Sequence, residues 1–431
     1  MPAFSETSKP TKSTDSPQTQ ASSFSDRNFT WSVFGALSST RVVRIIISIA
    51  SGALWARYVT PSDYGQFQLI MSFVAIAASL SLNGLGQSLT LSAAKQHDGN
   101  FIPILKSKII ATCVGSIGLI FLSFYYRNSQ PSLFDGLLLA ALFFPLYELQ
   151  KIWTAWFSGR GWLKALSGLK IGHALLSLGV LGTLILSHQA SLPNLVIGLV
   201  GITSIVSAVL VVYIFTHLQN KKTDQSIISF GFHATAASLL NSLILTDKLI
   251  INEYLAIEDV AVYTIALVFP NQIKALFGIF SNMITPQISK VDKIVDAWAY
   301  LRPKMPFITL LFIFIGIIGF FMIPIFLPII FSERYVQAIP YGKWLWLILS
   351  FTAPASYLSS ILRAQKKVKF VYIFELSHPV ILITLILALI DYGLWGIVYA
   401  KAIHYTTASV FFVGTFYFYL YREKKRLQKE G

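Results

Sequence analysis

The chain has 431 residues, of which 55% are hydrophobic and only 12% are charged, and its formal net charge is +15. Soluble proteins average about 25% charged residues, so the polar side chains here are too few to cover two or three soluble domains. A mean hydropathy of +0.64 indicates instead a protein whose solvent is a lipid bilayer.

The first 29 residues are rich in Ser, Thr, Gln and Pro, unlike the rest of the chain. This composition cannot bury enough apolar surface to form a core, so residues 1–29 are predicted to be a disordered tail. The tail has no basic start followed by an apolar run and a cleavage site, which argues against a signal peptide.

From residue 30 onward, one apolar stretch follows another. A bilayer core of about 30 Å needs roughly 20 apolar residues per helix, and this rule predicts about twelve membrane-spanning helices. The stretches are too long and too uniformly apolar for β-barrel strands, so the expected fold is an all-α membrane protein. The predicted spans are 30–54, 65–82, 109–125, 136–157, 171–188, 195–215, 227–252, 260–284, 306–331, 339–362, 371–390 and 394–419.

Basic residues are distributed unevenly between the predicted loops. If both termini and the even-numbered loops lie on one side, that side holds most of the 34 Lys and Arg residues. The opposite loops hold only Arg57, Arg127 and Arg334. This is the positive-inside pattern, which predicts an even number of spans and two cytoplasmic termini. Membrane topology therefore explains the positive charge better than nucleic-acid binding does.

A short pattern after the first predicted span recurs after the seventh. The pattern Tyr-x4-Asp-x-small-x-aromatic is shared by two sets of residues 196 positions apart (254 − 58), namely Tyr58, Asp63, Gly65 and Phe67, and Tyr254, Asp259, Ala261 and Tyr263. Two parallel six-helix repeats facing each other across a cleft would produce this layout. We interpret the motif as structural, with the aspartates capping helices and Gly65 allowing close packing.

The repeat predicts an N-terminal six-helix bundle over residues 30–217 and a C-terminal six-helix bundle over residues 227–420. A cytoplasmic linker (218–226) joins the bundles, and a basic tail (421–431) follows them. No motif indicates a metal, a cofactor or a nucleic acid, and the lack of a nucleotide-binding loop argues against direct powering by ATP.

Charged residues also lie inside the predicted spans, where each costs roughly 2.5–3.5 kcal/mol at a helix centre. They are therefore expected to face a cavity or one another, and the excess of cations predicts a positive cleft that suits an anionic substrate. The basic residues are Arg41, Arg44, Lys151, Lys248, Lys274, Lys343 and Lys401, and the acidic ones are Glu148, Asp247 and Glu375.

Arg41 and Arg44 form the most distinctive pair, because they share a helix face that has no local acid. Guanidinium groups bind phosphate or carboxylate through paired hydrogen bonds, which makes both residues candidate substrate ligands. For Arg41 the alternative is that its side chain extends to the cytoplasmic interface. The other candidate cavity cations are Lys248, Lys274 and Lys401.

A second group of charged and polar residues is a candidate coupling network. Glu148 and Lys151 share a helix face, as an ion pair within the helix or as binding residues. Asp247 points about 100° away from the lysine that follows it and needs a partner of its own. Glu375 and His378 also share a face, either as a plain interfacial pair or as a proton relay.

Residues 54–67 (LWARYVTPSDYGQF) resemble the ARxLxPxDYGxF turn that follows the first span of oligosaccharide flippases, with Val59 in place of Leu. These flippases are the polysaccharide-transport branch of the multidrug/oligosaccharidyl-lipid/polysaccharide exporter superfamily. Asp247 with residues 262–263, and residues 331–335 (FSERY) with Ala338, are similar to the family's features at its seventh-to-eighth and ninth-to-tenth spans. The resemblance covers essentially residues 27–420.

The resemblance implies a flippase that moves an undecaprenyl-pyrophosphate-linked oligosaccharide across the bacterial inner membrane by alternating access. The cargo would be a repeat unit of O-antigen, capsule or exopolysaccharide. Two lobes of six helices around a cationic cavity are the implied fold. The expected partners are this lipid-linked anionic oligosaccharide, membrane lipids, and the polymerase and chain-length proteins of the same pathway.

Two other functions fit a membrane protein of this size. A multidrug exporter of the sister branch shares the implied fold, but a positive cleft disfavours cationic drugs. A polysaccharide polymerase or ligase would need a sizeable outer loop for its catalytic site, and every outer loop here is short. We therefore expect a transporter rather than an enzyme.

Overall fold

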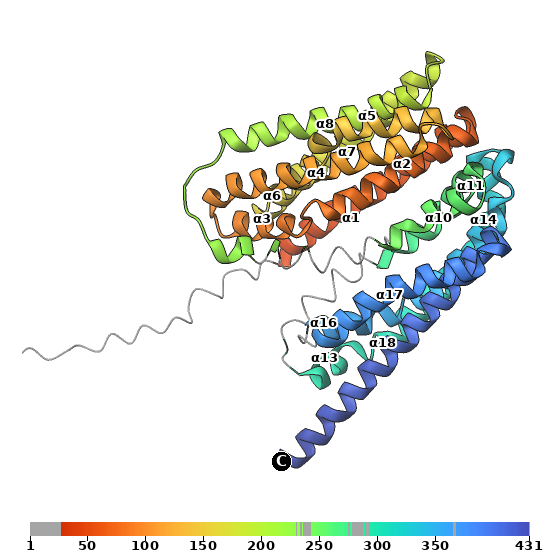
Figure 1. The fold of residues 1–431 in the computed structure, drawn as a ribbon. Coiled ribbons are helices and arrows are strands. Elements are labelled where there is room, and N and C mark those ends of the chain that lie inside the picture. The colour runs from red at the N-terminus through yellow and green to blue at the C-terminus, as the bar shows by residue number, and fades with distance from the viewer. Residues whose placement is uncertain are drawn as a thin grey trace, which may run out of the picture.

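The computed structural model describes residues 27–229, 231–232, 235, 243–274, 276–277, 288, 291, 293–364 and 368–430. Over these residues the chain folds into helices and connecting turns, arranged in an N-terminal lobe, α1 to α8, and a C-terminal lobe, α10 to α18 (Figure 1). The predicted all-α membrane fold with two helical bundles is confirmed.

The N-terminal lobe contains α1 (Arg27–Tyr58), α2 (Pro61–Leu80), α3 (Gly84–Ala94), η1 (Asp98–Asn100), α4 (Phe101–Tyr126), α5 (Pro131–Tyr147), α6 (Leu149–Gly159), α7 (Leu163–Leu186) and α8 (Leu192–Thr216). The C-terminal lobe contains η2 (Leu243–Thr246), α10 (Asp247–Tyr254), α11 (Ile257–Val268), α13 (Ile294–Leu301), α14 (Met305–Phe331), η3 (Glu333–Tyr335), α15 (Ala338–Thr352), α16 (Ala355–Ala364), α17 (Val368–Leu389), η4 (Ile390–Tyr392) and α18 (Leu394–Glu430).

Five of the described segments are long and apolar enough to cross a bilayer, and the pair α2–α3, bent by 61°, is a sixth if it counts as one span. The five are Asp98–Tyr126, Pro131–Gly159, Leu163–Leu186, Leu192–Thr216 and Met305–Phe331. The remaining predicted spans coincide with helices that are broken, carry charges or continue outside the described residues. The protein is thus a multi-pass membrane protein with a fold of about twelve helices.

Several helices extend beyond the predicted spans. α1 begins at Arg27, and the rest of the tail predicted to be disordered, residues 1–26, lies outside the described residues. α4 and α7 begin eight residues before the predicted spans (109 − 101 and 171 − 163), so Lys108 and Lys170 belong to helices rather than to loops. α18 continues to Glu430, so the basic tail extends the last helix.

The two motif aspartates occupy equivalent places in the lobes. In α2, the Asp63 backbone N–H donates to Thr60 Oγ1 at 3.1 Å, and the Thr60 hydroxyl donates to Asp63 Oδ2 at 2.7 Å. In α11, Asp259 Oδ2 accepts from the Ala256 backbone N–H at 3.1 Å. Each aspartate is the third residue of its helix. In α2 the free backbone N–H is bonded by Thr60, whose hydroxyl the Asp63 carboxylate holds, whereas in α11 the Asp259 carboxylate itself accepts from a free backbone N–H.

At one end the lobes share a hydrophobic core, and at the other end each has its own. The shared core joins Trp55 and Phe144 of the N-terminal lobe to Tyr263 and Tyr335 of the C-terminal lobe. A second core, around Trp153, involves α3, α4, α6 and α8, whereas a third involves α13, α14, α16 and α18. The lobes therefore approach each other near α2 and α11 and separate toward α3 and α13 (Figure 1).

The closed end is held by contacts that involve the backbone. A Cβ atom at Gly65 would lie 2.2 Å from the carbonyl oxygen of Ile257, so a side chain there would force α2 and α11 apart. Arg57 donates from Nε to the Ile330 carbonyl at 3.2 Å and from Nη2 to the Ile329 carbonyl. These carbonyls belong to the last turn of α14, which lacks partners within the helix. Arg57 of one lobe thus caps a helix of the other.

Candidate functional site

Two helix breaks in the N-terminal lobe place polar groups beside a cavity. α2 stops at Leu80 and α3 starts at Gly84, while Glu148 separates α5 from α6 three residues after Pro145. Proline removes a backbone donor and weakens the helix around it. In membrane proteins, broken helices are tolerated where they line a cavity or are buried in protein, because the freed backbone groups need partners.

Lys108 of α4 connects both breaks. Its ammonium donates to Glu148 Oε2 at 2.8 Å and to the Ser81 carbonyl at 2.6 Å, and only 2% of the lysine is exposed. Lys151 lies 3.1 Å from the same Glu148 oxygen and donates to Asn83 Oδ1 at 2.7 Å. The predicted Glu148–Lys151 pair is therefore part of a cluster in which two lysines hold one carboxylate.

Two neighbouring hollows lie beside this cluster, and together we call them the polar cavity. One has a volume of about 390 Å³ and the other about 240 Å³, and Gln150 and Lys151 line both. Leu245 of the C-terminal lobe lines the larger hollow, so the polar cavity faces the space between the lobes.

Cations from three helices converge on the smaller hollow. They are Arg44 of α1, Lys151 of α6 and Lys170 of α7. His173, one turn after Lys170, lies 3.0 Å from Thr203 Oγ1 through its Nε2 atom. Glu148 is the acidic residue among the described residues that line the polar cavity, and it is already paired with Lys108. The cavity therefore carries a net positive charge.

The other predicted cavity arginine lies close by. Arg41 is half-buried one turn before Arg44 on α1 and so shares its helix face, as the spacing predicted. In the C-terminal lobe, Lys248 donates to Gln68 Oε1 of α2 at 2.8 Å, which links the two lobes. Lys248 therefore lies at the lobe interface, where its ammonium bonds to a side chain of the other lobe.

Lys401, which we expected in the cavity, lies in a buried cluster instead. Its ammonium is 2.8 Å from Asp247 Oδ2, and the Tyr263 hydroxyl donates to the same oxygen at 2.6 Å. Lys401 is 5% exposed and Tyr263 is 1% exposed, so this cluster around Asp247 is closed off from water. Asp247 thus has a partner different from that of Lys248, as their 100° separation on the helix required.

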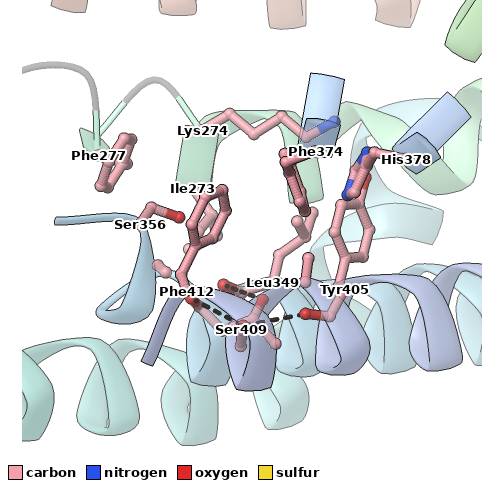
Figure 2. Close-up of a pocket in the computed structure, with 13 residues that line it drawn as sticks. Ile273, Lys274, Phe277, Leu349, Ser356, Phe374, His378, Tyr405, Ser409 and Phe412 are labelled. Carbon is pink, nitrogen blue, oxygen red and sulfur yellow. Dashed lines mark hydrogen bonds between the residues drawn. The ribbon is translucent and has the colours of Figure 1, made fainter. Parts of the chain in front are cut away.

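A second cavity, of about 230 Å³, lies within the C-terminal lobe, and we call it the aromatic cavity. Figure 2 shows Lys274 and His378 at its upper side, with aromatic rings around its walls. The aromatic lining residues are Phe277, Phe374, Tyr405 and Phe412. The Lys274 ammonium lies 5.8 Å from the Tyr405 ring centre, so it is positioned for a cation–π contact.

The predicted Glu375–His378 relay can be described only on the histidine side. The Glu375 side chain lies outside the described residues. His378 packs against His404 of α18, with 3.5 Å between ring centres. The two imidazoles therefore make a ring-to-ring contact between α17 and α18.

Sequence reasoning missed Lys108 and Lys170, because both were assigned to loops. For Lys170 a signal was present: it stands three residues before His173, the same spacing that identified Arg41 and Arg44. For Lys108 no local signal exists, since its partners Ser81 and Glu148 are 27 and 40 residues away.

Residues 54–340 match a family model described as polysaccharide biosynthesis protein. No match was found among curated proteins. One similar solved structure is an inward-facing multidrug resistance MATE family transporter of the MOP superfamily, with 11% identity and a TM-score of 0.68, over 89% of this chain and 99% of that chain. An outward-facing structure of such a transporter has 11% identity and a TM-score of 0.67, over 91% and 96%.

A third similar structure is the MATE transporter ClbM in complex with Rb⁺, with 15% identity and a TM-score of 0.57, over 88% of this chain and 94% of that chain. At these identities the likeness shows the fold, which is the two-lobe fold of MATE transporters. The TM-scores to the inward-facing and outward-facing structures are nearly equal.

Proposed function

The chain belongs to the family of polysaccharide biosynthesis proteins, and from this premise we propose that it is a flippase for lipid-linked oligosaccharides. The observation that supports the proposal most is the convergence of Arg44, Lys151 and Lys170 on the smaller hollow of the polar cavity. Three cations from three helices, near a single acid that Lys108 already holds, are suited to a dense anionic group such as a pyrophosphate.

The proposed substrate has three parts with different requirements. The pyrophosphate would bind at the polar cavity, where Arg44 can offer a planar pair of donors and the lysines add point charges. The sugars would occupy the polar space between the lobes, and the polyprenyl tail would stay in the lipid. The polymerase and chain-length proteins of the same pathway are proposed partners that would receive the product.

We also propose an orientation in the bacterial inner membrane. The separated end of the lobes carries the loops that hold most of the basic residues, and the described C-terminus lies at this end (Figure 1). By the positive-inside rule, this end faces the cytoplasm, and both termini are cytoplasmic. The structure would then be the inward-open state, ready to receive substrate from the leaflet where it is made. Alternating access would proceed by separation of the closed end.

A second candidate function is multidrug-type export. It is favoured by the shared fold with MATE multidrug transporters and by the aromatic cavity, whose walls suit a flat apolar molecule. Against it stand the cations of the polar cavity and Lys274 at the aromatic cavity, which would repel cationic drugs. Because the similar solved structures are transporters, an enzyme of the same pathway is the weaker alternative.

Deletion of the gene tests the proposal and separates it from drug export. We expect completed lipid-linked oligosaccharide to accumulate on the cytoplasmic face of the deletion strain, with unchanged drug sensitivity. The wild-type gene should restore export, whereas Arg44→Ala should restore it poorly despite normal amounts of folded protein. Normal export without the gene, or with Arg44→Ala, would refute the assignment, and a gain in drug sensitivity alone would support the second candidate.

A further inference from the structure

A short helix at the open end of the C-terminal lobe is fixed against the last helix. α13 buries Ile294, Ala297 and Leu301, which follow helical spacing and place one face on the lobe. Its first turn is held by Glu423 of α18, whose Oε2 atom accepts from the Val295 backbone N–H at 2.9 Å. The contact fixes the start of α13, the end away from Arg302, against α18.

Between the end of α13 and α18 lies a pocket of about 380 Å³. Its lining residues are Trp298, Arg302, Tyr417, Leu420, Tyr421 and Lys424. The Trp298 ring meets Tyr417 edge-on, with 6.1 Å between ring centres, so the indole is held in a fixed orientation. The pocket thus combines an aromatic wall with two exposed cations, Arg302 directly after α13 and Lys424 on α18.

The pocket lies where apolar surface gives way to basic surface. On α14, Phe307, Leu310 and Phe314 are 67%, 65% and 62% exposed, which in a membrane protein marks a face toward acyl chains. The chain segment just before them carries Arg302 and Lys304, which are exposed. Trp and Tyr side chains prefer the depth at which lipid headgroups begin, so the aromatic wall belongs at this boundary.

Two neighbouring cations also lie over aromatic rings. The Lys304 ammonium lies 3.1 Å from the ring centre of Tyr300, and the Arg422 guanidinium lies 5.6 Å from that of Phe418. The acid not yet accounted for, Asp296, is in the first turn of α13, at the end away from Arg302. The pocket end of α13 is therefore positively charged, and the other end carries the acids.

We propose that this pocket binds the phosphate headgroup of an anionic membrane phospholipid. Arg302 and Lys424 would hold the phosphate, the Trp298 and Tyr417 rings would contact the glycerol region, and the acyl chains would lie along the exposed face of α14. The site is separate from the polar and aromatic cavities, so its occupant is a resident lipid and not the transported molecule. Free phosphate lacks the apolar part that the aromatic wall and α14 would contact.

The test measures binding of short-chain phosphatidylglycerol, phosphatidylcholine and inorganic phosphate to the purified full chain by native mass spectrometry. The variants are Arg302→Gln/Lys424→Gln and, as a matched control, Lys425→Gln/Lys429→Gln, which removes the same charge elsewhere on α18. We expect roughly 20-fold weaker phosphatidylglycerol binding for the first variant, since each base near anionic lipid contributes about a factor of five. The control variant should bind within a factor of two of the wild type.

Three results would overturn the proposal: equal losses in both variants, equal binding of phosphatidylcholine, or phosphate binding as tight as that of the lipid. If the pocket variant fails to fold, a second measurement replaces it. The wild type and Trp298→Phe are compared for fluorescence quenching by brominated phosphatidylglycerol and brominated phosphatidylcholine. The quenching attributable to Trp298 should be stronger with the anionic lipid, and equal quenching by both lipids would contradict the site.

Discussion

The polar cavity and the aromatic cavity occupy matching places in the two lobes but have opposite linings. Each lies beside a break between two helices, α5–α6 in the N-terminal lobe and α15–α16 in the C-terminal lobe, and each is lined by the helix that follows, α7 or α17. One contains three cations from three helices, whereas the other contains phenylalanines, a tyrosine and a histidine with a single cation, Lys274. The same arrangement of helices thus surrounds a cationic cavity in one lobe and a mainly aromatic cavity in the other. This difference suits a substrate that is charged in one part and apolar in another.

Glu148 in the N-terminal lobe and Asp247 in the C-terminal lobe are both buried, and the two acids differ in how many cations hold them. Glu148 lies within 2.8 Å of Lys108 and 3.1 Å of Lys151, whereas Asp247 has the ammonium of Lys401 and the hydroxyl of Tyr263. Loss of one lysine leaves Glu148 paired but leaves Asp247 with no bonded cation. The C-terminal cluster should therefore be the more fragile one.

The largest expected effect is the destabilisation caused by Lys401→Met. Removing one partner of a buried ion pair costs about 3–5 kcal/mol, because the remaining charge is stranded away from water. Lys108→Met should cost clearly less, since Lys151 still contacts Glu148. Thermal unfolding of the purified protein in detergent measures both, and the double variant Asp247→Asn/Lys401→Met should recover part of the loss. An equal or larger loss for Lys108→Met would contradict the comparison.

A smaller effect is expected for Lys170→Gln in the polar cavity. A hydrogen bond to a charged group contributes about 1.5–3 kcal/mol, so losing one should weaken binding of an undecaprenyl-pyrophosphate lipid roughly tenfold or more. Binding is measured by titration of a fluorescent analogue into purified protein. Lys222→Gln, in the linker between the lobes, removes the same charge away from the cavity and serves as the control. Equal effects of the two substitutions would mean that only overall charge matters.

Phe374→Ala in the aromatic cavity should change binding of the same pyrophosphate lipid by less than about a factor of two. The substitution removes an apolar wall and leaves Arg44 and Lys170 in place. Binding of a flat apolar dye should fall instead, because the cavity loses aromatic contact area. If Phe374→Ala weakens binding of the pyrophosphate lipid as strongly as Lys170→Gln does, both cavities bind this lipid, which contradicts the proposed separation of their roles.

The smallest effect concerns the linker that joins the lobes. The Asp224 carboxylate accepts from the Ser226 hydroxyl at 2.5 Å and from the Ser226 backbone N–H at 3.0 Å, and the hydroxyl bond is the largest cause that lowers the pKa of Asp224. A lowered folded-state pKa stabilises the fold above the ordinary carboxyl pKa of about 3.9, and this contribution is lost as the pH falls through the lowered value.

Ser226→Ala should therefore lower thermal stability slightly at neutral pH, because the bond from the hydroxyl to the Asp224 carboxylate is lost. It should also raise the Asp224 pKa toward its ordinary value. The difference between variant and wild type should shrink when the unfolding temperature is measured below about pH 4. A difference that grows on acidification would contradict the assigned cause.

Features set by neighbouring residues were accessible from the sequence, whereas features set by distant residues were not. The first-turn contacts of Asp63 and Asp259 and the shared face of Arg41 and Arg44 depend on spacings of three residues, so they are accessible to the pattern, although the cap of α2 is Thr60 rather than Asp63. The Asp247–Lys401 pair joins residues 154 positions apart and depends on how α10 packs against α18. No local rule assigns that partner.

The break at Glu148 was equally inaccessible. An apolar run reads as one span whether or not it bends, so Glu148 appeared as an ordinary residue of the predicted span 136–157, whereas Ser81 lay at the end of the predicted span 65–82. Their free groups, which recruit Lys108, exist only because α2 and α5 stop there. Because the polar cavity lies beside these breaks, its outline could not be predicted from the sequence.

We propose that the polar cavity carries an anionic lipid-linked oligosaccharide across the membrane. The most direct test of this proposal uses proteoliposomes that contain labelled undecaprenyl-pyrophosphate-linked oligosaccharide, with an externally added, membrane-impermeant hydrolase reporting how much label reaches the outer leaflet. We predict that wild-type protein makes the inner-leaflet pool accessible and that Arg44→Gln/Lys170→Gln does not, although it is folded and reconstituted equally. No movement with the wild type, or equal movement with the variant, would contradict the account.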